Sequence, residues 1–244
     1  MSQFQVRQPD VRNRLLAALP PDDFALLAGS LRPVDLELRQ VLHEPDQPVA
    51  AVHFPEGGMV SMIAALEDGA MQEVGLIGRE GVVGLAVVLG ADSTPIEALV
   101  QAPGPALRLP AAGLRAAFDS SPALRAALLR HVQAFHLQVT RTAACNGRHA
   151  LEERLARWLL MAHDRAGGER FPMTQEFMAM MLGVRRAGVS VAAGFLRKAG
   201  VIGYARGCVT VLERAGLEGA SCGCYRATRE RSERLPGAGA AAGG

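Results

Sequence analysis

The sequence predicts an α+β protein in which an N-terminal antiparallel β jelly roll is followed by a long helix and a smaller C-terminal part. Three observations lead to this fold class. Short apolar segments separated by turn signals fill residues 36–109, and a stretch of about 25 residues with helical spacing follows Pro122. Two helical patterns joined by a glycine then precede two strand-like segments within residues 173–212.

The N-terminal half has the texture of a small β domain. Residues 10–31 are predicted to be helical, with a break at Pro20-Pro21, and turn clusters such as Asp68-Gly69 and Pro103-Gly104-Pro105 punctuate the region that follows. Short strands at this spacing indicate an antiparallel barrel or jelly roll. The strand-like segments are Val49–Phe54, Met59–Ala65, Met71–Ile77 and Ala98–Gln101.

A long helix is predicted for residues 122–149. Ser121 is a suitable N-cap with Pro122 at the first helical position, and no glycine occurs before Gly147. A broken heptad seam along it favours a dimer contact, although the same spacing also fits a helix lying on its own barrel. The seam residues are Leu124, Leu128, His131, Phe135, Gln138, Thr142 and Cys145.

These textures divide the chain into four parts. Residues 1–121 are expected to form a jelly-roll sensor domain, and residues 122–149 a dimerisation helix. An apolar helical stripe begins at Leu151, so residues 150–225 are expected to form a separate C-terminal domain. Residues 226–244 end in a run of Gly, Ala and Pro that buries little apolar surface, so they are expected to be a disordered tail.

Charge and hydropathy limit the classes of protein. Residues 1–150 carry 12 basic and 15 acidic side chains (−3), whereas residues 151–244 carry 14 basic and 9 acidic ones (+5). This asymmetry suits a C-terminal part that meets a polyanion. No uncharged apolar run reaches the ~20 residues of a membrane helix, and the N-terminus does not resemble a secretory signal, so we expect a cytoplasmic protein that does not contact membranes.

The four cysteines all lie after residue 144. Cys222-Gly223-Cys224 could be a redox or metal element, but two reduced thiols are the favoured interpretation, because no CxxC pair is present. Cys145 and His149 lie four residues apart on the long helix, where one helix face could offer both to a metal or haem. Ordinary packing is favoured there too, so the sequence predicts no metal centre and no cofactor.

Residues 173–212 carry the clearest functional signal. Thr174 is a good N-cap for a short helix over Gln175–Leu182, and Gly183 supplies a left-handed residue for a sharp turn. A second helix is predicted from about Arg185 to Ala199. The helix-turn-helix pattern consists of a short helix, a glycine turn and a longer helix with a basic N-terminal end. An ordinary helical hairpin with a charged face has the same spacing.

The segment that follows favours the DNA-binding interpretation. Val201–Tyr204 and Cys208–Leu212 are predicted strands around Ala205-Arg206-Gly207, and a basic hairpin after a recognition helix is a wing. The residues that would face base edges are Arg185, Arg186, Ala187, Ser190 and Val191. Arg197, Lys198 and Arg206 would reach phosphates. The predicted DNA-binding residues are Thr174, Gln175, Arg185, Arg186, Ser190, Arg197, Lys198 and Arg206.

The order of these parts resembles the Crp/Fnr family of bacterial transcription regulators over roughly residues 10–225. Thr174-Gln175-Glu176 and Leu182–Arg186, followed by Val189 and Leu196, resemble the family's helix-turn-helix. Leu137–Thr140 resembles the middle of its dimerisation helix, and Glu153–Leu160 resembles the helix after its interdomain hinge. The resemblance implies a sensor domain of the cyclic-nucleotide-binding type and a homodimer on a two-fold-symmetric site in double-stranded DNA, in contact with RNA polymerase.

The chain departs from the family pattern in its sensor. Members that bind cyclic AMP have a glycine followed by a glutamate, and later an arginine for the phosphate. Here the glycine matches Gly84, but Leu85 stands at the glutamate position, and no basic residue lies between Arg79 and Arg108. A buried phosphate needs a charge partner, so cyclic AMP is not expected to bind. No cysteine precedes Cys145, which excludes the N-terminal iron–sulfur centre of the oxygen-sensing members.

The recognition helix departs as well, because Ala187 and Val191 stand where many members have a glutamate and an arginine. No phosphate-loop, H-E-x-x-H or G-x-S-x-G motif is present, so the chain is not expected to be an enzyme. The sequence therefore predicts a sequence-specific regulator of transcription with an unknown effector, or none. The alternative is a sensor that acts through protein contacts and carries a vestigial DNA-binding domain.

Overall fold

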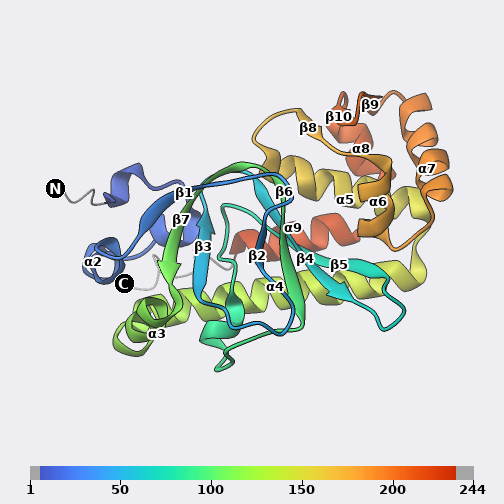
Figure 1. Cartoon of the computed structure of the whole chain (residues 1–244). Helices are drawn as coiled ribbons and strands as arrows, with labels where there is room; N and C mark the ends of the chain where they lie inside the picture. The colour runs from blue at the N-terminus through green and yellow to red at the C-terminus, as the bar shows by residue number, and fades with distance from the viewer. Residues whose placement is uncertain (1–5, 235–244) are drawn as a thin grey trace.

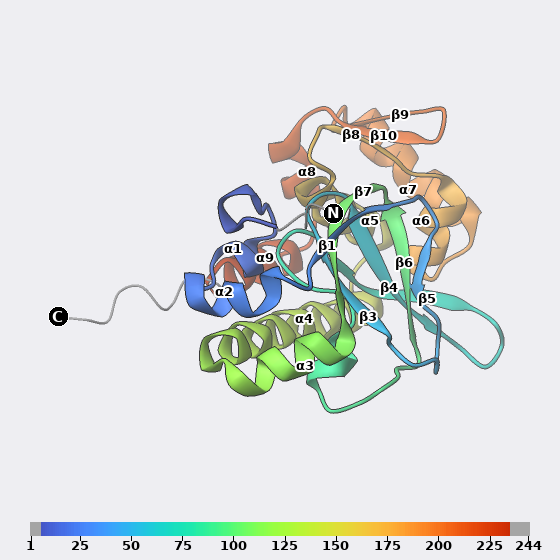
Figure 2. The same cartoon turned by 60° about the vertical axis from the view of Figure 1, so that its left-hand side comes forward.

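A computed structural model describes residues 6–234 as two parts joined by one long helix (Figures 1 and 2). β-sheets make up most of the N-terminal part, the helix α4 (Pro122–Arg148) runs beneath them, and the C-terminal helices gather at the far end of α4. The elements before α4 are η1 (Gln8–Asp10), α1 (Arg14–Ala17), α2 (Pro21–Ala28), β1 (Arg32–Leu36), β2 (Val41–His43), β3 (Ala51–Pro55), β4 (Met59–Ala65), β5 (Met71–Ile77), η2 (Leu85–Val88), β6 (Ile96–Ala102), β7 (Gly104–Pro110) and α3 (Ala111–Ser120).

The strands form two antiparallel sheets, in the orders β1-β7-β3 and β2-β6-β4-β5. Side chains from both sheets, among them Leu36, Val60 and Ala106, share one buried cluster. The sheets face each other as in a jelly roll and do not close into a barrel, which confirms the predicted fold class. β4 and β5 have the predicted bounds because clear turn residues such as Asp68-Gly69 flank them.

The caps of α4 are local and are those expected. The Ser121 hydroxyl accepts a hydrogen bond from the backbone N–H of Leu124 at 2.9 Å, and Pro122 occupies the first helical position. The helix ends at Arg148, and His149 is its C-terminal cap residue.

The seam residues of α4 were predicted to contact a second chain. This prediction is wrong, because they pack against other parts of the same chain. Leu124 and Leu128 are buried among the N-terminal helices. His131 accepts a hydrogen bond from the Val82 backbone N–H at 3.2 Å. The Gln138 side-chain amide pairs with the Leu76 backbone at 2.6 and 3.0 Å. A three–four spacing identifies the covered face of a helix but not what covers it, and here the N-terminal helices and β5 with the loop after it cover most of this face.

The C-terminal part combines a helical layer with a three-stranded sheet in the order β8-β10-β9. The predicted short helix has the observed bounds, whereas β8 has no local signal and is defined only by its pairing with β10. Its elements are α5 (Leu151–Ala166), β8 (Arg170–Pro172), α6 (Gln175–Leu182), α7 (Arg186–Lys198), β9 (Ile202–Ala205), β10 (Cys208–Val211), α8 (Arg214–Ala220) and α9 (Cys224–Arg234).

One apolar core continues across the two parts. Met59, Ile63 and Leu76 of the β2-β6-β4-β5 sheet belong to the same buried cluster as Leu155 and Leu159 of α5. The C-terminal part is therefore packed on the β2-β6-β4-β5 sheet and is not connected to it through the chain alone.

The expected disordered tail is contradicted over residues 226–234, because the chain there continues α9. Thr228 on α9 is buried, as is Tyr225 in its first turn, and the helix packs against α4. These scattered contacts anchor a segment of low hydrophobicity. Residues 235–244, the remainder of that predicted tail, lie outside the described residues.

Within residues 6–234, no single helix has the length and apolar character needed to cross a membrane. Only α6 and α7 taken together reach that composition, and they are bent by 105° relative to each other.

Candidate DNA-binding surface

Helices α6 and α7 form a helix-turn-helix with the expected local construction. The Thr174 hydroxyl caps α6 by accepting a hydrogen bond from the Phe177 backbone N–H at 3.2 Å. Gly183 ends α6 with φ +62°, in the left-handed region that glycine adopts without strain. The bend of 105° lies in the range of the motif.

The turn is also held from outside by the sensor sheet, through a residue that the sequence did not single out. Gln72 of β5 donates a hydrogen bond to the Met181 carbonyl at 2.7 Å. A Cβ on Gly183 would lie 1.8 Å from the Gln72 side-chain oxygen. Gly183 is therefore required both for its backbone conformation and for the approach of Gln72.

The inner face of α7 packs on the domain, and its outer face is open. Val189, Ala192, Ala193 and Leu196 are buried, at the spacing expected for one stripe. On the opposite side Arg185, Arg186 and Ser190 are exposed at the N-terminal end, and Arg197 and Lys198 are exposed at the C-terminal end. The predicted recognition helix thus presents its basic residues outward.

Two apolar side chains share this open face. Val191 and Phe195 are each 58% exposed. Large exposed apolar groups on a recognition helix can contact thymine methyl groups. Val191 was expected in a base-facing position, whereas Phe195 was not anticipated.

Polar contacts between α6 and α7 order the basic end of this surface. Arg186 forms an ion pair with Glu176 at 2.6 Å, and the Ser190 hydroxyl donates to the Gln175 side-chain oxygen at 2.9 Å. Four residues from the two helices therefore lie together. Glu176 is the one that sequence reasoning missed, and its acidic charge at the start of α6 was the available signal.

The hairpin of β9 and β10 is the predicted wing. Arg206 and Gly207 form its two-residue turn, with φ +51° and +71°, which is the conformation of a type I′ turn. Glycine, asparagine and aspartate are the usual residues there, so an exposed arginine at the first position is a strained choice. The wing, defined here as residues 202–211, therefore presents a charge at its tip at some cost in backbone energy.

Polar contacts at the boundary with the sensor are buried. The Trp158 indole N–H of α5 donates to one Glu73 carboxyl oxygen at 2.6 Å. Ser61 lies 2.7 Å from the other oxygen and 2.6 Å from the Gln101 side-chain oxygen. One hydroxyl proton cannot serve two acceptors, so a protonated Glu73 that donates to Ser61 satisfies this geometry. Burial raises the pKa of Glu73 to about 7, although hydrogen bonds that Ser61 and Trp158 would donate to the ionised carboxylate act in the opposite direction.

The sensor segment that corresponds to the cyclic-AMP cassette is apolar. Gly84 has φ +103° and precedes η2, and Leu85 packs against the cluster that contains Val52 and Val82. Arg108 is exposed. These positions offer neither an acidic group for a ribose nor a buried cation for a phosphate.

Comparisons with known proteins agree with this geometry. Residues 153–220 match the family model described as the Crp-like helix-turn-helix domain. No curated protein matches the chain.

Solved structures match over most of the chain. FixK2 from Bradyrhizobium japonicum has a TM-score of 0.68 at 19% identity, covering 79% of this chain and 98% of that one. A putative transcriptional regulator of the Crp/Fnr family from Eubacterium rectale has a TM-score of 0.67 at 15% identity, with 87% and 97% covered. A transcriptional regulator of the CRP family from Thermus thermophilus has a TM-score of 0.66 at 20% identity, with 77% and 96% covered.

The chain thus has the fold seen in Crp/Fnr regulators and carries a Crp-like helix-turn-helix domain, in agreement with the resemblance noted in the sequence. The domain and the fold together support DNA-binding regulation of transcription as its general function.

Proposed function

We propose that the chain is a homodimeric, sequence-specific regulator of transcription that places α7 in the DNA major groove and the wing against the backbone. The observation that carries this proposal is the open face of α7, where basic side chains are exposed at both ends while the opposite stripe is buried in the domain. An ordinary surface helix also carries charged residues on its outer face, but those of α7 (Arg186, Arg197 and Lys198) are all basic, which suits a polyanion.

The predicted site residues divide into two roles. Arg185, Arg186 and Ser190 lie at the N-terminal end of α7, which enters the groove first, so they are assigned to base edges. Arg186 suits guanine because its guanidinium reaches O6 and N7 together. Five residues are assigned to phosphates. Thr174 and Gln175 lie beside this end, Arg197 and Lys198 lie at the C-terminal end of α7, and Arg206 lies on the wing.

Dimerisation is assigned to the open face of α4, because the seam predicted from the sequence is occupied. Leu129 is 46% exposed there, and Gln133, His136 and Thr140 are exposed at spacings of four, three and four. A dimer through this face would present two copies of α7 to a two-fold-symmetric site in double-stranded DNA. Their centres must lie about 34 Å apart for successive major grooves.

The sensor is proposed to lack cyclic-AMP binding, because no buried cation stands near Gly84 and Leu85. A signal, if one exists, would act on the packing of α5 and α6 against β4 and β5, where Gln72 and Glu73 make the boundary contacts. RNA polymerase is the partner that the family suggests, and we retain it as part of the proposal.

The test is binding of the full-length protein to DNA sites selected from a random library. Affinity should fall steeply with added salt, because phosphate contacts release counterions. Arg186→Ala should cost about 1–3 kcal/mol at its own base pair and relax selectivity there. Arg197→Ala should weaken all sites equally. Arg12→Ala, at an exposed arginine just before α1 in the N-terminal part, should leave DNA affinity unchanged.

A protein that binds no DNA at low salt would contradict the proposal. That result would favour the alternative of a sensor that works through protein contacts. A uniform loss of affinity in Arg186→Ala would reassign this residue to a phosphate.

A further inference from the structure

The side chains of three cysteines and one histidine lie close together near the junction of α4 and α5. Cys145 and His149 come from the end of α4, and Cys222 and Cys224 come from the link between α8 and α9. Their ligand atoms all lie within 4.8 Å of one another. Among residues 6–234 this is the only group of three or more such side chains that could hold an ion.

The individual separations match one tetrahedral ion. Sγ of Cys145 lies 3.3 Å from Sγ of Cys222, and Nδ1 of His149 lies 3.3 Å from Sγ of Cys145 and 3.9 Å from Sγ of Cys224. Bond lengths of about 2.3 Å to sulfur and 2.0 Å to nitrogen give tetrahedral edges of roughly 3.5–3.8 Å, so small shifts of these side chains would admit the ion. An iron–sulfur cluster spreads its ligands over several irons and needs a wider arrangement than this one.

The surroundings suit thiolates. The Cys145 and Cys222 sulfurs are within hydrogen-bond distance of each other at 3.3 Å, and the Cys224 backbone N–H donates to the Cys222 sulfur. All three cysteines are buried.

A nearby arginine gives an independent indication of missing negative charge. Arg157 is 4% exposed, and its Nε has no hydrogen-bond partner among the described residues. Its charge acts on both Cys145 and Cys224. Zn²⁺ with three thiolates and one neutral imidazole carries a net charge of −1, which a buried guanidinium offsets.

We propose that Cys145, His149, Cys222 and Cys224 form a structural Zn²⁺ site that fastens the start of α9 to the end of α4. This differs from the absence of a metal expected from the sequence. All four positions are filled by protein, which is the arrangement of structural and not catalytic zinc. Binding releases the thiol protons of Cys145, Cys222 and Cys224 to solvent, and His149 coordinates through Nδ1 as the neutral imidazole.

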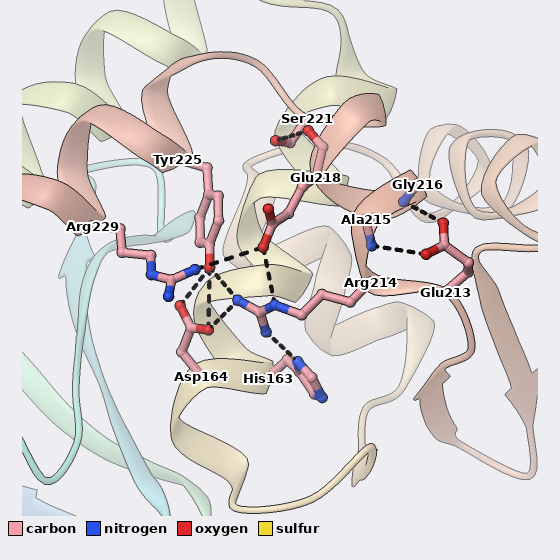
Figure 3. A network of polar contacts seen from close by, with 10 residues as sticks. All are labelled: His163, Asp164, Glu213, Arg214, Ala215, Gly216, Glu218, Ser221, Tyr225 and Arg229. Atoms are coloured by element: carbon pink, nitrogen blue, oxygen red, sulfur yellow. Dashed lines mark hydrogen bonds and ion pairs between the residues drawn. The ribbon is translucent and has the colours of Figure 1, made fainter.

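The site acts together with a second anchor for α9 (Figure 3). Tyr225, the residue after Cys224, donates to the Asp164 carboxylate at 2.9 Å, and Arg214 binds the same carboxylate at 2.6 Å. The first turn of α9 is thus held on α5 by this network and on α4 by the metal. The zinc site would thereby fix the DNA-binding domain relative to the long helix at the hinge.

The test begins with the metal content of the full-length chain, purified with reductant and without an affinity tag or chelator. We expect about one zinc per chain, retained on dialysis. Cys222→Ser and His149→Ala should each lower zinc affinity at least about tenfold. Cys208→Ser is the matched control, because Cys208 is half-buried on β10 outside the cluster, and it should keep full zinc content.

A second measurement does not depend on variants that fold. Zinc is removed from the wild-type chain with a chelator, and Co²⁺ is added back. Tetrahedral thiolate ligation should give strong visible d–d bands and a near-ultraviolet sulfur-to-cobalt band, both abolished by one equivalent of zinc.

Several results would overturn the proposal. One is a reduced protein that contains no zinc and develops no cobalt band. Iron with inorganic sulfide in place of zinc is another, and so is a Cys145–Cys222 disulfide in the freshly isolated protein. None of these depends on DNA, so DNA binding measured on the same sample separates failure of this site from failure of the proposed function.

Discussion

The C-terminal domain has two sides that are built in opposite ways. The side formed by α5 and α6 is buried against the β2-β6-β4-β5 sheet. Trp158 and the Met181 carbonyl on this side are paired with Glu73 and Gln72 of β5. The side formed by α7 and the wing is open, and apart from the Glu176–Arg186 pair its charged residues face solvent. The first side is suited to receive a conformational signal and the second to bind a polyanion, so changes on the two should have separable effects.

The largest effect is expected for Glu73→Gln on the buried side. Because the pKa of Glu73 is raised to about 7 in the fold, its ionisation opposes folding. Stability is therefore fully present below a pH near the ordinary carboxyl pKa of about 4.5 and is lost as pH rises through about 7. The variant mimics the protonated acid, so relative to wild type it should gain roughly 2–3 kcal/mol between pH 5 and 8.

This gain is measured by denaturant unfolding at several pH values. Glu80→Gln is the control at the same boundary, because Glu80 is paired with Arg165 at 2.7 Å and its loss should destabilise the fold at neutral pH. The prediction would be contradicted if the free energy of unfolding varied with pH in the same way for wild type and Glu73→Gln.

Gly183→Ala should remove about 2 kcal/mol from the free energy of unfolding. The new Cβ stands in a left-handed conformation and displaces Gln72, which loses its bond to Met181. Gly219→Ala, at a helical glycine with open space around it, should be neutral or stabilising. Adding Gln72→Ala to Gly183→Ala should bring no further loss, and a fully additive double variant would show that the two residues are not coupled.

On the open side, Arg206→Asn should weaken DNA binding without weakening the fold. Asparagine accepts positive φ more readily than arginine, so the free energy of unfolding should be unchanged or slightly higher. Removing one phosphate contact should reduce the slope of log affinity against log salt by about 1. Fluorescence anisotropy across a salt series measures this slope, and an unchanged value would place the wing away from DNA.

The smallest effect is expected for Glu176→Gln, which should tighten DNA binding about two- to threefold. The exposed ion pair with Arg186 contributes little to stability, while its carboxylate repels phosphates. Competition binding at low salt against wild type would detect the gain. A loss of affinity would mean that Glu176 positions Arg186 for its base.

Local chemistry made part of this molecule predictable from sequence. Ser121 and Thr174 cap their helices within three residues, and Gly183 marks the turn, so α4, α6 and α7 were located closely. Features that depend on residues far apart in the sequence could not be predicted in this way. β8 exists through its pairing with β10. The inward face of α4 is covered by the N-terminal helices, β5 and α9 of the same chain, not by a second chain.

The candidate metal site illustrates the same limit. Each pair of ligands was visible as a spacing, Cys145 with His149 and Cys222 with Cys224. Only the packing of α9 on α4 brings the pairs together, 77 residues apart for Cys145 and Cys222. Two weak local patterns become one four-ligand cluster when the tertiary fold is known.

The core shared by the sheet and α5 has a practical consequence for anyone who divides this protein. Cutting at Ala150 would leave Met59, Ile63 and Leu76 facing water on one fragment and Leu155 and Leu159 on the other. Both fragments would then expose apolar patches that promote aggregation, so truncated versions are poor substitutes for the intact chain in any assay.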